Sequence, residues 1–581
     1  MHELKWWQKA VFYQIYPRSF ADANGDGIGD LEGIRRHLDY LQDLGIEAIW
    51  LCPHYPSPLV DWGYDVADYT DVAPEYGTLA DFQRLLDEAH RRNIRVILDL
   101  VLNHTSDQHP WFQESRSSRD NPKRDWYIWR DGKAGGPPNN WLSAFGGSAW
   151  EYDPATGQYY YHFFFKEQPD LNWRHPEVKR AMFDAVRFWL DRGVDGFRLD
   201  AVGTIFEDPG WPDVAAPMSY PEWLKAWQGA SDEAERERLW RIRQEIFRHQ
   251  EDLPEVHDLM RELRALVDTY GDIVLVGETE DLAYYGNGRD ELHLVFNFPL
   301  MKAPRLTPAA VRANQRERLG RMPPGAWPCN TMGNHDVSRV LSRYGDGQHD
   351  LEIARIAAAL MLTLRGTPFL YYGEEIGMRD LILTDLAQFK DPLGRWWYQM
   401  ERELFGTPHE EAVIRGARFG RDKCRTPMQW SSGPNAGFCP PGVSPWLPVH
   451  PNHALGVNVA DQLEDGDSLL SFYRRLIHLR QRTPALVAGD YRPLAEDAEE
   501  ALIFLRRLPP DSQACLVAIN MSDRPTQALT GLAAWGRCLF STHRAERSEE
   551  SVQALRLAPF EITIMEIVEN LGEVHSPNPR G

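Results

Sequence analysis

Cysteine is scarce in this chain. Six Cys occur in 581 residues, and none has the CxxC or CxxH spacing of a zinc site. A disulfide framework is also excluded, because such frameworks belong to much shorter secreted chains. We therefore expect free thiols, most of them buried.

Long apolar runs and an excess of positive charge are also missing. No run approaches the roughly 18 apolar residues that a membrane-spanning helix needs, and the N-terminal stretch MHELKWWQKAVFYQIY lacks a signal-peptide core. Lys and Arg number 63 against 85 Asp and Glu, a balance that repels nucleic acid and anionic membranes. These absences predict a cytoplasmic protein without nucleic-acid or membrane partners, and they leave its oligomeric state open.

Aromatic residues, in contrast, are abundant at 12% of the chain. Most aromatic side chains belong to cores, but their flat faces also stack on sugar rings. Together with the acidic surface, this composition favours a neutral carbohydrate ligand such as a small oligosaccharide.

Strand-like and helix-like segments alternate over most of the sequence. Eight strand-like runs lie at 11–16, 48–53, 95–101, 196–201, 273–278, 292–298, 327–334 and 369–374. Helix-like segments between them, such as 80–92, place apolar side chains on one face. This alternation predicts an α/β fold, a (β/α)₈ barrel whose active site lies on the loops after the strands.

The same pattern predicts the domain boundaries. The barrel comprises residues 1–103 and 175–486, with an inserted subdomain at 104–174 after the third strand. Residues 487–570 change to short alternating runs, which indicate a C-terminal antiparallel β-sandwich. The last residues, 571–581, are expected to be a disordered tail.

Three acidic residues lie at or just after the ends of strand-like runs and are predicted to share one barrel mouth. Asp200 lies in GFRLDA, Glu278 in VLVGETE and Asp336 in GNHD. Arg198 shares a strand face with Asp200 and would keep it ionised, as a nucleophile requires. A structural ion pair is the alternative for any one of these groups, but convergence of several at one mouth favours acid/base and nucleophilic chemistry.

A metal site is predicted in the string DANGDGIGD at 22–30. Oxygen ligands fall at the EF-hand-like spacing of Asp22, Asn24, Asp26, Asp30 and the Ile28 carbonyl. The twelfth position is Gly rather than Glu, so a single structural Ca²⁺ or Mg²⁺ is expected rather than an EF-hand pair. An ordinary Asp/Asn/Gly turn is the alternative reading, and no organic cofactor is expected.

Further strings show a family resemblance over essentially the whole chain. They are AVFYQIYPRSF, GYDVADY, FGGSAW, QPDLNW, GTPFLYYGEEIGM and RDKCRTPMQW. With the four acidic strings, including DLVLNH at 99–104, they resemble the α-amylase superfamily of glycoside hydrolases (family thirteen), in its α-glucosidase and oligo-1,6-glucosidase branch.

The resemblance implies a retaining mechanism. Asp200 would attack the anomeric carbon, Glu278 would protonate the leaving oxygen and later activate water, and Asp336 would stabilise the transition state. Retention predicts that the nucleophile and acid carboxyl groups lie about 5–5.5 Å apart. By the same resemblance, the terminal glucose would be held by Asp61, Tyr64, His104, Phe145, Phe164, Arg198, His335 and Arg425. Arg421, one turn from Arg425, is the alternative for the last of these.

The preferred linkage is predicted from the residue after the nucleophile. In this branch it tends to be Val in enzymes that cleave α-1,6 bonds and Thr or Ala in those that prefer α-1,4 bonds, and here it is Ala201. We expect an exo-acting α-glucosidase with a preference for maltose-like substrates. An oligo-1,6-glucosidase, a trehalose-forming isomerase and a transglucosylase remain alternatives, and a non-catalytic sugar-binding or transporter-accessory relative is a remote one.

An insertion at 203–250 separates Asp200 from Glu278 and is longer than the branch leads us to expect. It would either close the subsites beyond the first sugar or contact a neighbouring subunit. Its charged part, from 231 to 249, is predicted to be a solvated helix.

Overall fold

The computed structural model describes residues 3–230, 232–508 and 512–570. The predicted disordered tail at 571–581 lies outside these ranges. None of the helices within them is both long enough and apolar enough to cross a bilayer.

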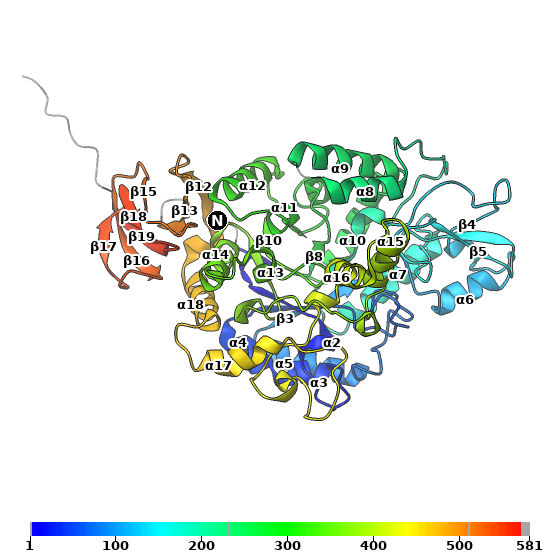
Figure 1. Ribbon diagram of the computed structural model, residues 1–581, viewed down its shortest axis with the longest axis horizontal. Coiled ribbons are helices and arrows are strands. Elements are labelled where there is room, and N and C mark those ends of the chain that lie inside the picture. Colours follow the sequence, from blue (N-terminus) through cyan, green and yellow to red (C-terminus); the bar gives the residue numbers. More distant parts are fainter. Residues whose placement is uncertain (1–2, 231, 509–511, 571–581) are drawn as a thin grey trace, which may run out of the picture.

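Eight parallel strands form the centre of the molecule (Figure 1). They pair in the order β10-β11-β1-β2-β3-β7-β8-β9, and a parallel bridge between Phe296 and Cys329 joins β9 to β10, which closes the barrel. The strands are β1 (Phe12–Ile15), β2 (Ala48–Leu51), β3 (Arg95–Leu100), β7 (Gly196–Leu199), β8 (Val274–Gly277), β9 (Leu294–Val295), β10 (Cys329–Thr331) and β11 (Thr367–Tyr371). The predicted (β/α)₈ fold is confirmed.

Helices surround this barrel. They are α1 (Trp6–Lys9), α2 (Pro17–Phe20), α3 (Leu31–Arg36), α4 (Leu38–Leu44), α5 (Leu79–Arg91), α7 (Pro176–Leu190), α10 (Glu255–Asp268), α11 (Phe298–Met301), α12 (Pro308–Arg321), α13 (Val340–Tyr344), α14 (Asp350–Thr363), α18 (Leu469–Arg482) and α19 (Pro484–Ala488). In α5 a capping box between Thr78 and Asp81 fixes the start, and Phe82, Leu85 and Leu86 are buried on one face. The β8–β9 connection contains only a 3₁₀ turn at Leu282–Tyr285, which leaves that side of the mouth open to other segments.

Long connections supply the remaining elements of the barrel face. The insertion after β3 carries α6 (Pro110–Ser117) and a small antiparallel sheet of β4 (Trp129–Arg130), β5 (Trp150–Asp153) and β6 (Gln158–Tyr161). The stretch after β7 carries α8 (Tyr220–Gly229) and α9 (Glu233–Phe247). The stretch after β11 carries α15 (Pro392–Glu403), α16 (His409–Phe419) and α17 (Val459–Leu463).

Helix α9 differs from the solvated helix expected at this place. Leu239, Ile242, Ile246 and Phe247 are buried in a cluster that also contains Trp150 of the small sheet and Trp397 of α15. Their spacing of three to four residues gives α9 an apolar face despite its many charges. The two insertions and α15 therefore pack together beside the barrel mouth (Figure 1).

The C-terminal part is an antiparallel β-domain, as predicted. A six-stranded sheet pairs in the order β12-β13-β14-β19-β16-β17, and β15 pairs with β18. The strands are β12 (Asp490–Leu494), β13 (Ala501–Leu508), β14 (Gln513–Asn520), β15 (Thr526–Leu529), β16 (Ala534–Ser541), β17 (Glu549–Ser551), β18 (Ala554–Leu557) and β19 (Ile562–Asn570). One face packs on the barrel, where Phe540 meets Phe472 of α18.

Candidate active site

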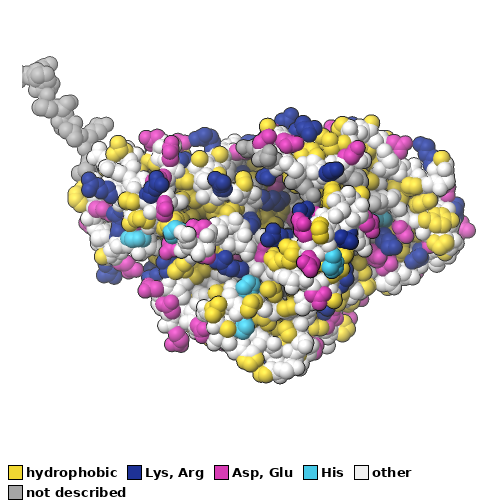
Figure 2. Space-filling model, in the orientation of Figure 1, with side chains coloured by type: hydrophobic (Ala, Val, Ile, Leu, Met, Phe, Trp, Pro, Cys, Tyr) yellow, Lys and Arg dark blue, Asp and Glu magenta, His cyan; other side chains and the backbone are white. Residues whose placement is uncertain are grey.

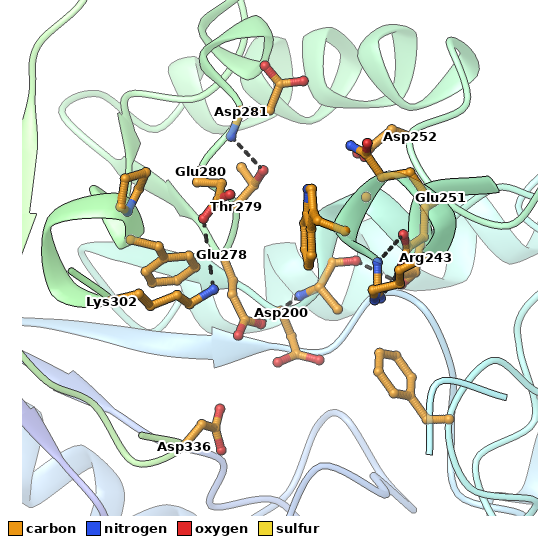
Figure 3. A pocket seen from close by; sticks show the side chains of 18 of the residues that line it. Asp200, Arg243, Glu251, Asp252, Glu278, Thr279, Glu280, Asp281, Lys302 and Asp336 are labelled. Atoms are coloured by element: carbon orange, nitrogen blue, oxygen red, sulfur yellow. Dashed lines mark hydrogen bonds and ion pairs between the residues drawn. The ribbon is translucent and has the colours of Figure 1, made fainter. Parts of the chain in front are cut away.

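The three predicted catalytic carboxylates line one pocket of about 960 Å³ at the carboxyl ends of the barrel strands (Figure 3). The backbone N–H of Asp200 donates to the Leu100 carbonyl and that of Glu278 donates to the Leu199 carbonyl, so each residue directly continues its strand ladder. Asp336 follows β10, and its N–H donates to the Asn334 side chain at 2.9 Å. Figure 2 shows one face of the molecule, with a recess near its middle and Lys and Arg among the side chains at the rim of that recess.

One guanidinium group holds two of the carboxylates. Arg198, which is 1% exposed, donates from Nη1 to Asp200 at 2.7 Å and pairs through Nη2 with Glu278 at 2.9 Å. It also donates to the buried carboxylate of Asp99 at 2.7 Å. Burial raises the pKa of Asp99 and of Asp200, and the Arg198 cation that they share partly offsets this rise.

The electrostatics differ between the carboxylates. Burial raises the pKa of Asp200 well above its ordinary value and the charge of Glu278 raises it further, while Arg198 opposes both. Burial alone would also raise the pKa of Asp336, but His335 and Arg425 outweigh it and hold that pKa below its ordinary value. Asp200 therefore keeps its proton to a higher pH than Asp336 does.

A strained residue lies between the nucleophile candidate and the acid candidate. Ala201 has φ 41° and ψ 48°, in the left-handed region that non-glycine residues rarely adopt. This turn aims its backbone N–H at Glu278, to which it donates at 2.9 Å. This hydrogen bond, together with the shared Arg198, holds the carboxyl group of Glu278 beside Asp200.

A buried hydrogen-bonded chain forms the floor behind the carboxylates. The Gln14 amide donates to His335 Nδ1 at 2.7 Å, which places the imidazole proton on Nε2. That nitrogen lies 2.6 Å from the Tyr64 hydroxyl, which in turn donates to Asp99 at 3.0 Å. These hydrogen bonds hold a neutral His335 in place beneath the pocket.

The inner end of the pocket is closed by an ion pair. Arg421 donates to Asp61 at 2.6 Å and to Asp391 at 2.7 Å, and Gln168 donates to the second oxygen of Asp61 at 3.1 Å. Asp61 and Arg421 are only 4% and 8% exposed, so the pocket does not continue behind them. Phe145 and Phe164, whose ring centroids are 5.3 Å apart, line the same pocket.

The predicted sugar-binding residues divide into two groups. Asp61, Tyr64, His104, Phe145, Phe164 and Ala201 line the pocket. Arg198, His335 and Arg425 do not, and they contact the acidic residues that do. Arg425 is fully buried and donates to Asp336 at 2.7 Å, whereas Arg421 lines the pocket.

Sequence reasoning gave no role to Asp99, Gln168 and Asp391. Asp99 and Gln168 do lie in strings that carried the resemblance, DLVLNH and QPDLNW, so position within those strings was a usable signal. Asp391 had none, because it reaches Arg421 only through the folding of the long stretch after β11.

The outer part of the pocket is formed by other segments. It is lined by Trp240, Arg243 and Gln244 of α9, by residues 279–282 after β8, by Lys302 and α12, and by Leu393 and Phe419 of α15 and α16. Sequence analysis assigned none of these side chains, because their approach depends on how three long connections pack.

The predicted metal loop has suitable donor atoms, but they form a turn network. Asp22 accepts N–H bonds from Gly25 and Gly27, and Asp30 accepts them from Ala23, Asn24 and Gly33. In the described ranges, no three His, Cys, Asp or Glu side chains are arranged so that they could hold a metal ion. The Ca²⁺ or Mg²⁺ site stays a prediction, and no catalytic step depends on it. All six Cys are unpaired and buried, as expected.

Comparisons with known proteins agree with this geometry. Residues 14–489 match the family described as alpha amylase, catalytic domain. An oligo-1,6-glucosidase from Parageobacillus thermoglucosidasius is 39% identical over 97% of this chain and 99% of its own length. A probable alpha-glucosidase from Rhizobium meliloti is 43% identical over 89% and 90%.

Solved structures are also similar over nearly the full length. The trehalulose synthase from Pseudomonas mesoacidophila is 38% identical with a TM-score of 0.85, covering 97% of this chain and 100% of that chain. An isomaltulose synthase variant from Erwinia rhapontici, solved with its natural substrate sucrose, is 37% identical with a TM-score of 0.85, covering 98% and 100%. On this evidence the chain belongs to the alpha-amylase family of glycoside hydrolases, as a relative of its oligo-1,6-glucosidases and alpha-glucosidases.

Proposed function

We propose that the protein is a retaining, exo-acting α-glucosidase that releases glucose from the non-reducing end of short α-glucosides, with α-1,4 bonds preferred. The observation that carries this proposal is a pocket with three carboxylates and a closed inner end. Because the Asp61–Arg421 pair blocks further passage, the geometry favours one terminal sugar over an internal segment of a chain.

In the first step the ionised Asp200 attacks the anomeric carbon while Glu278 gives its proton to the leaving glycosidic oxygen. A covalent glucosyl-enzyme forms and the shortened sugar departs. The Arg198 guanidinium holds the two carboxyl groups side by side, at 2.7 Å from Asp200 and 2.9 Å from Glu278, and this arrangement suits a neighbouring nucleophile and acid.

In the second step the carboxylate of Glu278 takes a proton from water, whose oxygen attacks the anomeric carbon and displaces Asp200. Asp336 stays ionised and faces the developing positive charge of the sugar in both steps. Arg425 and Arg421, which lie 2.7 and 3.8 Å from that carboxylate, support its ionisation.

The α-1,4 preference rests on Ala201. Its single methyl group leaves more room beside the nucleophile than a branched side chain would, which suits a differently directed second sugar. A change of this size in a pocket is worth about 1–3 kcal/mol. The enzyme would therefore prefer one linkage over the other without excluding the second.

One substrate panel tests the proposal. The enzyme is incubated separately with maltose, isomaltose, sucrose and trehalose, and the products are resolved by chromatography. We expect glucose from maltose at the highest kcat/KM, with α-glucose as the first-formed anomer by NMR. Faster isomaltose cleavage would overturn the linkage preference, and conversion of maltose to trehalose with little free glucose would overturn hydrolysis.

Asp200→Ala is the matching variant. It should lower kcat by several orders of magnitude, because the nucleophile is lost, while the circular dichroism spectrum stays that of the parent. Near-parental turnover would show that another group attacks the sugar.

A further inference from the structure

Two exposed aromatic side chains lie on the wall of the outer part of the pocket. Trp240 of α9 is 43% exposed and Phe419 at the end of α16 is 42% exposed, although both line the same pocket as Asp200 and Glu278. In Figure 1, α9 lies above α16 beside the barrel mouth. Large apolar rings left open inside a pocket indicate a surface that a ligand covers.

The Trp240 ring is braced from one side. The Arg243 guanidinium lies over it at 5.3 Å from the ring centroid and over Phe247 at 4.7 Å, and it makes two hydrogen bonds to Glu251 at 2.8 and 2.9 Å. Positions 240, 243 and 247 share one face of the helix. Because the indole is held in place, a ligand that stacks on it loses little side-chain entropy.

Phe419 is braced in a similar way. Its ring is stacked on Trp397 of α15, with centroids 4.1 Å apart and an interplanar angle of 10°. Trp397 belongs to the buried cluster that joins α9 to the small sheet. Both rings are therefore fixed to the same packed unit beside the mouth.

Six of the charged side chains in this outer part of the pocket form three ion pairs. Arg243 pairs with Glu251, Arg321 with Glu317 at 3.0 Å, and Lys302 with Glu280 at 3.8 Å. Figure 3 shows the first and last of these pairs on either side of the Asp200 and Glu278 carboxyl groups. Paired charges offer hydrogen bonds without a strong net field, which suits a neutral, hydroxyl-rich ligand better than an anionic one.

We infer that Trp240 and Phe419 are stacking platforms for sugar units on the leaving-group side, and that they make the enzyme favour trisaccharides and longer substrates over disaccharides. The inference rests on the proposed function, since it takes the first sugar to lie at the closed inner end. It gives the 203–250 insertion a role, because α9 carries one of the two platforms.

The test compares Trp240→Ala and Phe419→Ala with the parent on 4-nitrophenyl α-glucoside, maltose, maltotriose and maltotetraose. For each variant, kcat/KM on the tri- and tetrasaccharide should fall about tenfold more than on the aryl glucoside, the size of one lost ring contact. Isomalto-oligosaccharides of the same lengths are run in parallel, so that the result does not depend on the linkage preference.

Trp227→Ala is the control. Trp227 is also an exposed tryptophan of the insertion, 37% exposed and stacked on Trp223, but it does not line the pocket. The Trp227→Ala variant should leave the ratio of trisaccharide to aryl-glucoside kcat/KM unchanged. Trp240→Phe, which keeps a ring, should retain most of the chain-length preference and guards against a variant that misfolds.

The outcomes separate the two proposals. If the parent releases no glucose from any of these substrates, the proposed function fails. If the parent is active but Trp240→Ala and Phe419→Ala lower kcat/KM equally for all chain lengths, or not at all, the stacking role of Trp240 and Phe419 is contradicted. That role is also contradicted if Trp227→Ala changes the ratio of trisaccharide to aryl-glucoside kcat/KM as much as Trp240→Ala does.

Discussion

At the scale of single residues, Ala201 shapes the active site both through its backbone and through its side chain. Its left-handed backbone aims an N–H at Glu278, and its methyl group lies beside Asp200 in the pocket lining. A larger side chain here changes both the backbone energy and the space for the second sugar.

Ala201→Val should therefore shift linkage preference and lower stability. The ratio of kcat/KM for maltose to that for isomaltose should fall about tenfold, because a branched side chain narrows the space beside the nucleophile. The melting temperature should also fall, since a β-branched residue in the left-handed region costs about 1–3 kcal/mol. Both are measured on the purified variant.

Ala201→Gly is the matched control for this prediction. Glycine adopts the left-handed region without strain, so this variant should keep the maltose preference. A fall in the ratio for Gly as large as that for Val would mean that the backbone, and not side-chain volume, sets the linkage.

At the scale of elements, the loop between α2 and α3 carries the metal prediction. Its carboxylates already order the loop by accepting backbone N–H groups, and Asp30 also caps α3. A hard cation would find only oxygen donors there, at Asp22, Asn24 and Asp26.

If the loop binds Ca²⁺, millimolar Ca²⁺ should raise the melting temperature of chelator-treated protein by a few degrees, because a ligand that binds only the native state stabilises it. Asp22→Asn should abolish the response. Asp87→Asn, at an exposed position of α5, should keep it. An unchanged melting curve of the parent with and without Ca²⁺ would leave the loop as an ordinary turn network.

At the scale of the whole molecule, buried arginines link the C-terminal sheet to the barrel through hydrogen bonds to backbone carbonyls. Arg506 of β13 donates to the carbonyl of Thr363, the last residue of α14, at 2.6 Å, and to that of Gly489 at 2.9 Å. Arg480 of α18 donates to the carbonyls of Leu362, Gly366 and Leu486. Neither Arg506 nor Arg480 forms an ion pair within the described chain, so helix-terminal carbonyls balance their charges.

Arg506→Met should destabilise the protein by about 3 kcal/mol, since two or more buried carbonyl groups lose their donor at about 1–3 kcal/mol each. Urea unfolding measures the loss. Limited proteolysis should then release the C-terminal domain before the barrel is cut. Arg507→Met is the control, because the neighbouring side chain is 44% exposed and should cost 1 kcal/mol or less. Equal losses for the two variants would contradict the linking role of Arg506.

The barrel was predictable because its strands are buried on both sides and read as apolar runs that end in polar strings. Asp200 and Glu278 continue their strands directly, so their place at the mouth followed from the sequence pattern. The apolar face of α9 was also readable, since Leu239, Ile242 and Ile246 recur at helical spacing.

Other features were not readable because they depend on packing between distant segments. Arg421 and Arg425 lie one turn apart, and only the tertiary structure shows that Arg421 lines the pocket while Arg425 lies behind Asp336. Trp240 and Phe419 are 179 positions apart in the sequence and meet the same pocket only after three insertions have folded together. The bridge that closes the barrel joins Phe296 to Cys329 and has no sequence signature of its own.

The Asp61–Arg421 pair that ends the pocket also sets how the enzyme treats a long chain. With no exit behind this ion pair, a polymer cannot be threaded through and cut repeatedly while it stays bound. Each released glucose must leave by the opening through which the next chain end enters. The enzyme would therefore act distributively, with the remaining chain dissociating between cuts, and free glucose would compete with substrate for the same opening.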